Sequence, residues 1–102
     1  MKTLEVRLPH SLGAEAAHAK LDAALVKARA QYEQQVGPIE ATWEADDRLK
    51  VGLSVMGMRF DGQIDVLPEE LVVKLNLPMM ASMFAGKIRE GIEQQLAAVI
   101  KA

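Results

Sequence analysis

The chemically reactive side chains of this sequence are a few histidines, carboxylates and serines, and their spacing fits none of the usual catalytic or metal-binding motifs. His10 and His18 are eight residues apart and have no third ligand at a metal-site spacing. We expect His10 to be solvated or related to a helix cap, and His18 to lie toward the exposed side of a helix. Asp61 and Asp65 share one face of a strand pattern, where four residues place them roughly 13 Å apart. That exceeds the roughly 6.5 to 9.5 Å of an inverting carboxylate pair.

The remaining polar candidates are better explained by turns than by catalysis. Asp46–Asp47 and Glu69–Glu70 lie between strand patterns, where acidic residues favour turns. Ser11, Ser54 and Ser82 have no motif that supplies the base and orienting residue of a serine nucleophile. The sequence therefore predicts a protein that is not an enzyme and that carries no metal ion or cofactor.

Composition bounds the class of protein. The 102 residues suffice for one domain with a single core, which we place over residues 1–102. The absence of cysteine excludes disulfides and thiolate metal sites, and a net charge of -2 with a pI near 5.6 argues against nucleic-acid binding. Residues 1–10 hold no apolar signal segment, and no apolar run approaches the roughly 18 to 20 residues of a membrane span. We expect a cytoplasmic protein.

The elements that must position any site are read from the spacing of apolar residues. Between Trp43 and Leu77 apolar and polar residues alternate, which predicts an antiparallel meander with one dry face and one wet face. The dry face holds Leu49, Val51, Leu53, Val55, Met58, Phe60, Ile64, Val66, Leu71, Val73 and Leu75. The wet face holds Lys50, Ser54, Arg59, Asp61, Gln63, Asp65, Lys74 and Asn76.

Two helical patterns flank the meander and are candidates to cover its dry face. Residues 2–8 predict a first strand, and a helix follows over residues 12–35 with Ser11 as its N-cap. The inward stripe of this helix is rich in alanine and consists of Ala14, Ala17, Leu21, Ala24, Leu25, Ala28 and Tyr32. Gly37–Pro38 ends the helix, because glycine accepts positive φ and proline cannot continue the hydrogen-bond ladder.

The second helical pattern covers residues 79–100. Its inward stripe consists of Met80, Phe84, Ile88, Ile92, Leu96 and Val99. Gly86 and Gly91 each weaken such a helix by up to about 1 kcal/mol relative to alanine, and we expect close packing to offset that cost. Gly62, on the inward side of a strand, predicts a bulge or the close crossing of a helix backbone.

Together these elements predict an α+β fold of two layers. An antiparallel sheet carries both helices on one face, in the order β-α-β-β-β-β-α. A long helix held by a curved sheet is similar to the helix-grip architecture of lipid carriers, and this likeness concerns the fold alone.

Several phrases of the sequence occur in the same order in a known family. They are His10-Ser11-Leu12-Gly13, then Trp43, Asp47 and Leu49, then Gly57 and Gly62-Gln63-Ile64-Asp65-Val66, and finally Leu77-Pro78 followed by Phe84, Ile88 and Leu96. Over nearly its full length the chain resembles the small polyhydroxyalkanoic acid system proteins, also called the polyhydroxyalkanoate granule-region family. The resemblance implies a bacterial cytoplasmic protein connected with polyester storage granules. It supplies no catalytic residue, because the matching positions are mostly glycine, turn and core residues.

Methionine placement is the feature with a geometric argument for a surface site. Met56 and Met58 flank one hairpin turn, and Met79, Met80 and Met83 begin the second helix. In a simple meander that turn and the exit of the last strand lie at the same end of the sheet. Thioethers suit adaptable apolar contacts, so this edge either touches a partner, a lipid-like ligand or a granule surface, or plugs the end of the core. Parity predicts that Met58 and Met80 point inward and that Met56 and Met79 are exposed.

The leading expectation is a non-enzymatic accessory protein of polyhydroxyalkanoate storage that touches the granule surface or its coat proteins through apolar side chains. One alternative is a carrier of an acyl or other hydrophobic small molecule between helices and sheet, with Gly62, Gly86 and Gly91 leaving the space. A second alternative is a homo-oligomer whose interface is the methionine edge or an unpaired strand. Nucleic acid is not an expected partner.

Overall fold

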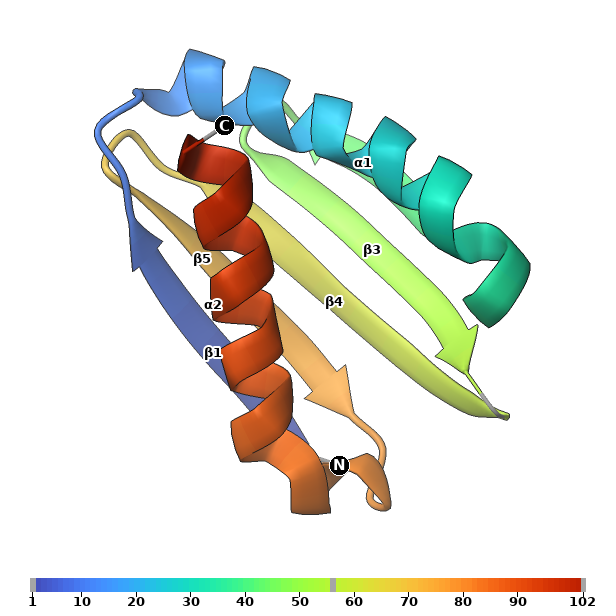
Figure 1. The fold of residues 1–102 in the computed structure, drawn as a ribbon. Coiled ribbons are helices and arrows are strands. Elements are labelled where there is room, and N and C mark those ends of the chain that lie inside the picture. The colour runs from blue at the N-terminus through green and yellow to red at the C-terminus, as the bar shows by residue number, and fades with distance from the viewer. Residues whose placement is uncertain (1, 56, 102) are drawn as a thin grey trace.

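The protein is built on a five-stranded antiparallel sheet with two helices across one face (Figure 1). A computed structural model describes residues 2–55 and 57–101. The strands are β1 (Lys2–Pro9), β2 (Glu40–Ala45), β3 (Arg48–Val55), β4 (Met58–Val66) and β5 (Glu70–Leu77), and the helices are α1 (Ala14–Val36), the short 3-10 helix η1 (Ala81–Phe84) and α2 (Ala85–Lys101). The predicted α+β fold and the order of its elements are confirmed.

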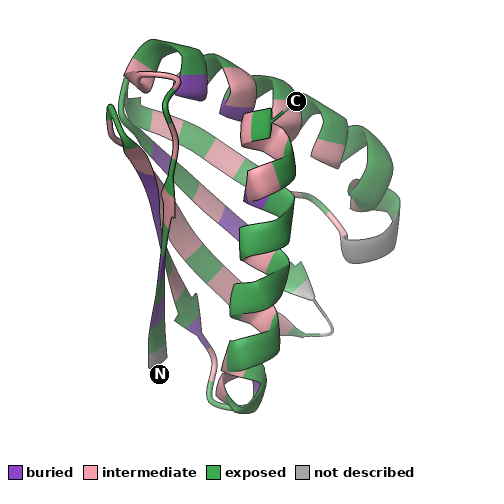
Figure 2. Cartoon of the chain, turned by 60° about the vertical axis from the view of Figure 1, so that its left-hand side comes forward, coloured by how far each residue is buried: buried purple, intermediate pink, exposed green. Residues whose placement is uncertain are grey.

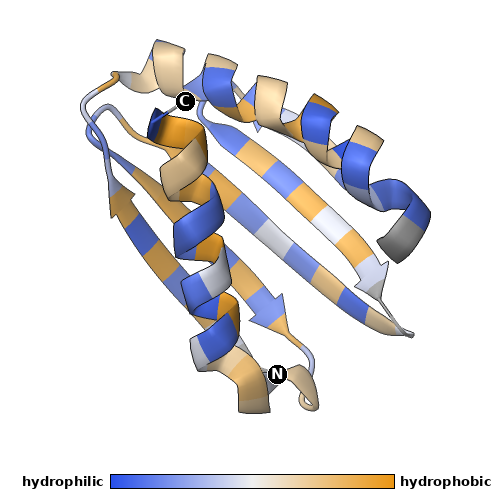
Figure 3. Ribbon diagram, in the orientation of Figure 1, coloured by the Kyte–Doolittle hydropathy of each residue, from blue (hydrophilic) through white to orange (hydrophobic). Residues whose placement is uncertain are grey.

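Strands β2 to β5 form the predicted meander, and β1 joins it beside β5, so that the sheet order is β1-β5-β4-β3-β2. The register aligns one apolar row across all the strands, which runs from Trp43 through Leu49, Ile64 and Val73 to Val6. Residues paired in this way point to the same side of a sheet, so the row lies beneath the helices. The alternation of apolar and polar residues along β1, β3 and β4 is visible in Figure 3.

The core lies beneath α2 and the first half of α1 (Figure 2). Its buried members include Leu4, Val6, Leu71, Val73 and Leu77 of the sheet, Ala17 and Leu21 of α1, and Leu96 of α2. Burying a leucine or valine side chain is worth about 1.5–3 kcal/mol, so these contacts hold the helices on the sheet. Leu53 and Phe60 are only half-buried, because they lie toward the β3–β4 hairpin, where the two helices diverge (Figure 1).

Helix α1 begins at Ala14, later than predicted, and Ser11 is not its N-cap. Gly13 occupies the cap position with a φ of 82°, which favours glycine, and no side chain caps the helix. The inward stripe is confirmed in the first half of the helix. Tyr32 in the later turns is 43% exposed, so the inward stripe ends earlier in the helix than the sequence predicts.

The second helical pattern is split in two, which corrects the prediction of one helix over residues 79–100. The carbonyl of Pro78 accepts the backbone N–H groups of Ala81 and Ser82, so the chain turns and forms η1 before α2 begins. A 3-10 helix has about three residues per turn instead of 3.6, which changes the face on which side chains emerge. The inward residues Ile88, Ile92, Leu96 and Val99 are confirmed, whereas Met80 and Phe84 are exposed.

The predictions for three glycines are wrong. A Cβ at Gly86 or Gly91 would meet nothing within 4 Å, so neither glycine serves close packing. Gly62 lies in regular register and marks neither a bulge nor a helix crossing. A Cβ there would lie 2.8 Å from the carbonyl oxygen of Lys74, so Gly62 allows β5 to approach β4 closely. The register shift lies instead in β2, at its pairing with β3.

Candidate functional site

Large apolar side chains are exposed together where β5 turns into α2. Met79, Met80, Met83 and Phe84 are 79%, 73%, 82% and 57% exposed, and we call this set the apolar corner. Single exposed apolar residues are common on protein surfaces, whereas a group of them marks an interaction site. The apolar corner is therefore the first candidate for a contact surface.

The local structure explains why the apolar corner faces outward. Ala81 is the buried residue of η1, 5% exposed, and it fixes the turn against the core. The hydroxyl of Ser82 donates to the carbonyl of Met79 at 2.7 Å, so it is satisfied within the turn. The sequence has no charged residue from Leu77 to Gly86. The apolar corner consequently offers thioethers and an aromatic ring on a stretch of chain that carries no charge.

The structure places the described methionines of the predicted edge, Met58, Met79, Met80 and Met83, at one end of the sheet. Because Asp61 of β4 pairs with Asn76 of β5, the β3–β4 hairpin and the exit of β5 lie at the same end. Met58 begins β4 at that end and is half-buried, and Met56 lies outside the described residues. Met79 is exposed as predicted and Met83 is exposed beside it, whereas the prediction of an inward Met80 is wrong.

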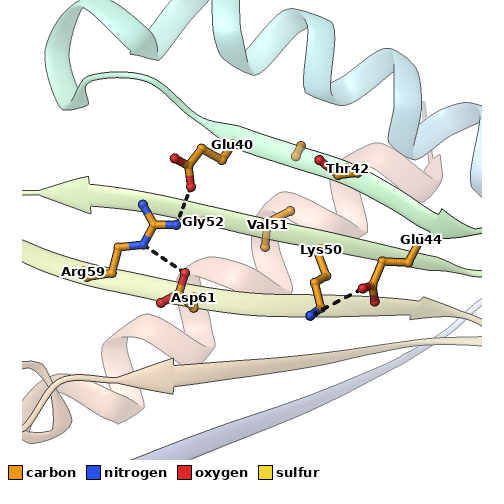
Figure 4. A pocket seen from close by; sticks show the side chains of 9 residues that line it. Glu40, Thr42, Glu44, Lys50, Val51, Gly52, Arg59 and Asp61 are labelled. Carbon is orange, nitrogen blue, oxygen red and sulfur yellow. Dashed lines mark hydrogen bonds and ion pairs between the residues drawn. The ribbon is translucent and has the colours of Figure 1, made fainter.

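The sheet face opposite the helices is polar, and we call it the open face. Arg59 of β4 lies across it, donating from Nε to Asp61 Oδ1 at 2.9 Å and from Nη2 to Glu40 of β2 (Figure 4). The guanidinium thus spans β3 to join strands that are not neighbours in the sheet. Hydrogen bonding to Glu40 and then to Asp61 raises the pKa of Arg59 above its ordinary value.

Gly52 of β3 makes room for this arginine. A Cβ at position 52 would clash with Arg59 Nη2 and would lie 3.0 Å from Asp61 Oδ1. A groove of about 240 Å³ opens around Gly52, and Lys50 of the same strand also lines it, with its Nζ paired with Glu44 at 3.4 Å (Figure 4). The charged side chains that line this groove pair with one another, so they are not available to bind a charged ligand.

A second groove, of about 380 Å³, lies beside the first on the open face. It is lined by residues of β1, β3, β4 and β5, among them Thr3, Lys50, Gln63, Lys74 and Asn76. Neither groove opens between the helices and the sheet, where the carrier alternative requires a cavity. These two grooves therefore give the carrier alternative no support.

The two aspartates first weighed as an acid–base pair each bind an arginine instead. Asp61 accepts from Arg59, and Asp65 accepts from Arg48 Nε at 3.0 Å. Ion pairs whose arginine is about half exposed add little stability. Within the part of the chain that the structure describes, no group of three His, Asp or Glu side chains is arranged to hold a metal ion.

The histidines both have structural partners. His10 accepts the N–H of Leu12 at Nδ1, 3.1 Å away, so its Nε2 carries the proton and donates to the carbonyl of Leu67 at 2.9 Å. His10 thereby ties the β1–α1 loop to the β4–β5 turn. His18 was predicted to lie toward the exposed side of α1, and that prediction is wrong, because the imidazole packs against Trp43 of β2.

Comparison with known protein families identifies the family of this chain. The family model for polyhydroxyalkanoic acid system proteins matches residues 4–100, a span that contains the apolar corner and both grooves except Thr3. Curated proteins and solved structures gave no match. No helix among the described residues is long and apolar enough to cross a membrane. Because the family match covers nearly the whole chain, this protein belongs to the family of polyhydroxyalkanoic acid system proteins.

Proposed function

We propose that the protein is a non-enzymatic accessory factor of polyhydroxyalkanoate storage that contacts the granule surface through the apolar corner. The observation that carries this proposal is the joint exposure of Met79, Met80, Met83 and Phe84. Family membership supports a role connected with polyhydroxyalkanoate storage, and the apolar corner is a surface that could contact the granule. The protein would then act in the cytoplasm, at the boundary between the granule and water.

The chemistry of the apolar corner suits a polyester. A polyester surface presents alkyl groups and ester carbonyls without formal charge, so contact through uncharged methionine and phenylalanine side chains costs no ion hydration. Methionine is flexible and polarizable, which lets it fill an irregular surface. Removing these side chains from water would contribute about 25 cal/mol for each Å² of apolar area buried. Binding of this kind persists at high salt, unlike binding through surface charges.

Co-sedimentation with purified polyhydroxybutyrate granules tests the proposal. The test variant is Met79→Glu with Met83→Glu, which places two carboxylates in the apolar corner. The matched control is Ala19→Glu with Val26→Glu, which adds the same charge at exposed positions on α1. We expect the wild-type chain and the control to sediment with the granules at low and high salt, and the test variant to remain in the supernatant.

Two outcomes would contradict the granule contact. One is a wild-type chain that stays in the supernatant with washed granules. The other is equal sedimentation of the test variant and the control, which would show that the apolar corner does not make the contact. Circular dichroism of both variants verifies that the added charges leave the fold intact, because all four positions are exposed.

A further inference from the structure

We propose that the second groove of the open face binds a small hydroxycarboxylate, with Lys74 holding the carboxylate. We call this site the Lys74 groove, and it is independent of the apolar corner. Its lining comes from four neighbouring strands, with Thr3 on β1, Lys74 and Asn76 on β5, Gln63 and Asp61 on β4, and Lys50 on β3. The groove has a volume of about 380 Å³, which exceeds that of a molecule of a few carbon atoms.

Lys74 is the cation of the open face that is left available. Arg7, Arg48, Lys50 and Arg59 each have a carboxylate within ion-pair distance, whereas Lys74 has none among the described residues. The nearest acidic residue in the register is Glu5, directly opposite on β1. Its carboxylate is held by Arg7 Nε at 3.1 Å. An ammonium group without a partner in a groove is suited to an anion from solution.

Hydrogen bonds within the groove fix which groups remain for a ligand. Thr3 Oγ1 donates to Asn76 Oδ1 at 3.1 Å, so the N–H groups of the Asn76 amide are free to donate. Gln63 Nε2 donates to Asp65 at 3.2 Å, so Gln63 Oε1 is free to accept. The groove therefore combines donors on β5 with an acceptor on β4.

This set of groups matches a carboxylate and a hydroxyl on one short carbon chain. The carboxylate would accept from Lys74 and Asn76, which lie on the same face of β5 with Cα atoms roughly 7 Å apart. The hydroxyl would donate to Gln63, which pairs directly with Lys74 in the register, with Cβ atoms about 5 Å apart. Asp61 also lines the groove, opposite Asn76 in the register, and its ion pair with Arg59 offsets the repulsion that its charge would exert on the ligand carboxylate.

Titration of the full chain, followed by two-dimensional amide NMR, tests this site with two probes. The probes are 3-hydroxybutyrate and butyrate, which differ by one hydroxyl, at matched ionic strength. We expect 3-hydroxybutyrate to produce saturable shifts at the amides of Thr3, Gln63, Lys74 and Asn76. Butyrate should bind at least about threefold more weakly, because it has no hydroxyl to donate a hydrogen bond to Gln63 Oε1.

Variants then separate a specific site from general attraction between charges. Lys74→Gln should weaken 3-hydroxybutyrate binding about fivefold or more, whereas Lys87→Gln, which removes an equally charged exposed lysine on α2, should leave it unchanged. Lys74→Arg should restore most of the affinity. Met79→Glu with Met83→Glu should bind normally, so that the failure of this proposal is distinct from the failure of the granule contact.

Three results would overturn the hydroxycarboxylate site. They are shifts that rise linearly without saturation, equal affinity for the two probes, and equal affinity of Lys74→Gln and the wild-type chain. Because Lys74 is exposed, the variant is expected to fold, and its unperturbed amide spectrum without ligand verifies that.

Discussion

The imidazole of His18 stacks on the indole of Trp43, with ring centroids 3.7 Å apart and an angle of 18° between the planes. Hydrogen bonds frame the stack, since Trp43 Nε1 donates to Asp22 at 3.3 Å and His18 Nδ1 lies 2.6 Å from the carbonyl of Asp46. Residues on α1, on β2 and in the β2–β3 turn are thereby joined in one cluster. This cluster fastens α1 to the edge strand of the sheet at the margin of the core, against which Trp43 packs.

Replacing His18 by alanine should lower the free energy of unfolding by about 1 kcal/mol, because the stacked pair and its hydrogen bond are lost. His18→Phe keeps a ring against the indole and should restore part of that loss. Trp43 is the single tryptophan of the chain, so its fluorescence reports the local change. Equal urea midpoints for the wild-type chain and His18→Ala would show that the stack does not stabilise the fold.

Two glycines on neighbouring strands should respond differently to alanine. At Gly62 the new Cβ would lie 2.8 Å from a backbone carbonyl that cannot move without separating β4 from β5, so Gly62→Ala should cost about 1–3 kcal/mol. At Gly52 the new Cβ meets the mobile ends of Arg59 and Asp61, which can swing into solvent.

Gly52→Ala should therefore leave the free energy of unfolding nearly unchanged while it displaces the Arg59 guanidinium from Glu40. Urea unfolding measures the first effect, and NMR of the arginine side chain measures the second. A loss of stability at position 52 as large as that at position 62 would contradict this distinction between backbone and side-chain neighbours.

Strand β3 should show a gradient of stability along its inward face. Leu49 is 0% exposed, whereas Leu53 near the hairpin is half-buried. Leu49→Ala should cost about 2–5 kcal/mol, since it removes a fully packed side chain and leaves a cavity. Leu53→Ala should cost clearly less, because part of its side chain already contacts water. Equal losses in denaturant titrations would mean that the helices cover the hairpin more fully than the structure shows.

The sheet could be predicted from sequence because alternation is a local signal that the register then preserves. Parity predicts that Leu49, Ile64 and Val73 share one face, and the structure pairs them in one row. A shift of one residue in any strand would have moved polar side chains into the core, so the pattern itself restricts the register.

The apolar corner and the His18 contact could not be predicted in the same way. A uniform helix over residues 79–100 would point Met80 and Phe84 inward, but the 3-10 turn that follows Pro78 interrupts the helical period. The partner of His18 lies on β2, far along the chain, so the partner could not be deduced from helix periodicity alone.

The same exposure that defines the apolar corner predicts the order in which methionines oxidise. Hydrogen peroxide should convert Met79, Met80 and Met83 to sulfoxides before Met58, because the first three are 79%, 73% and 82% exposed and Met58 is half-buried. Peptide mass spectrometry of a time course gives the order. Mild oxidation should preserve the circular dichroism spectrum, since these side chains contribute little to the core.

Oxidation also tests the granule contact without a substitution. A sulfoxide is polar, so a chain oxidised at Met79, Met80 and Met83 should sediment with polyester granules less than the untreated chain. Changing these methionines to leucine should keep the apolar surface and make sedimentation resistant to peroxide. If the leucine variant lost sedimentation as fast as the wild-type chain under peroxide, the loss would arise elsewhere in the protein and not at the apolar corner.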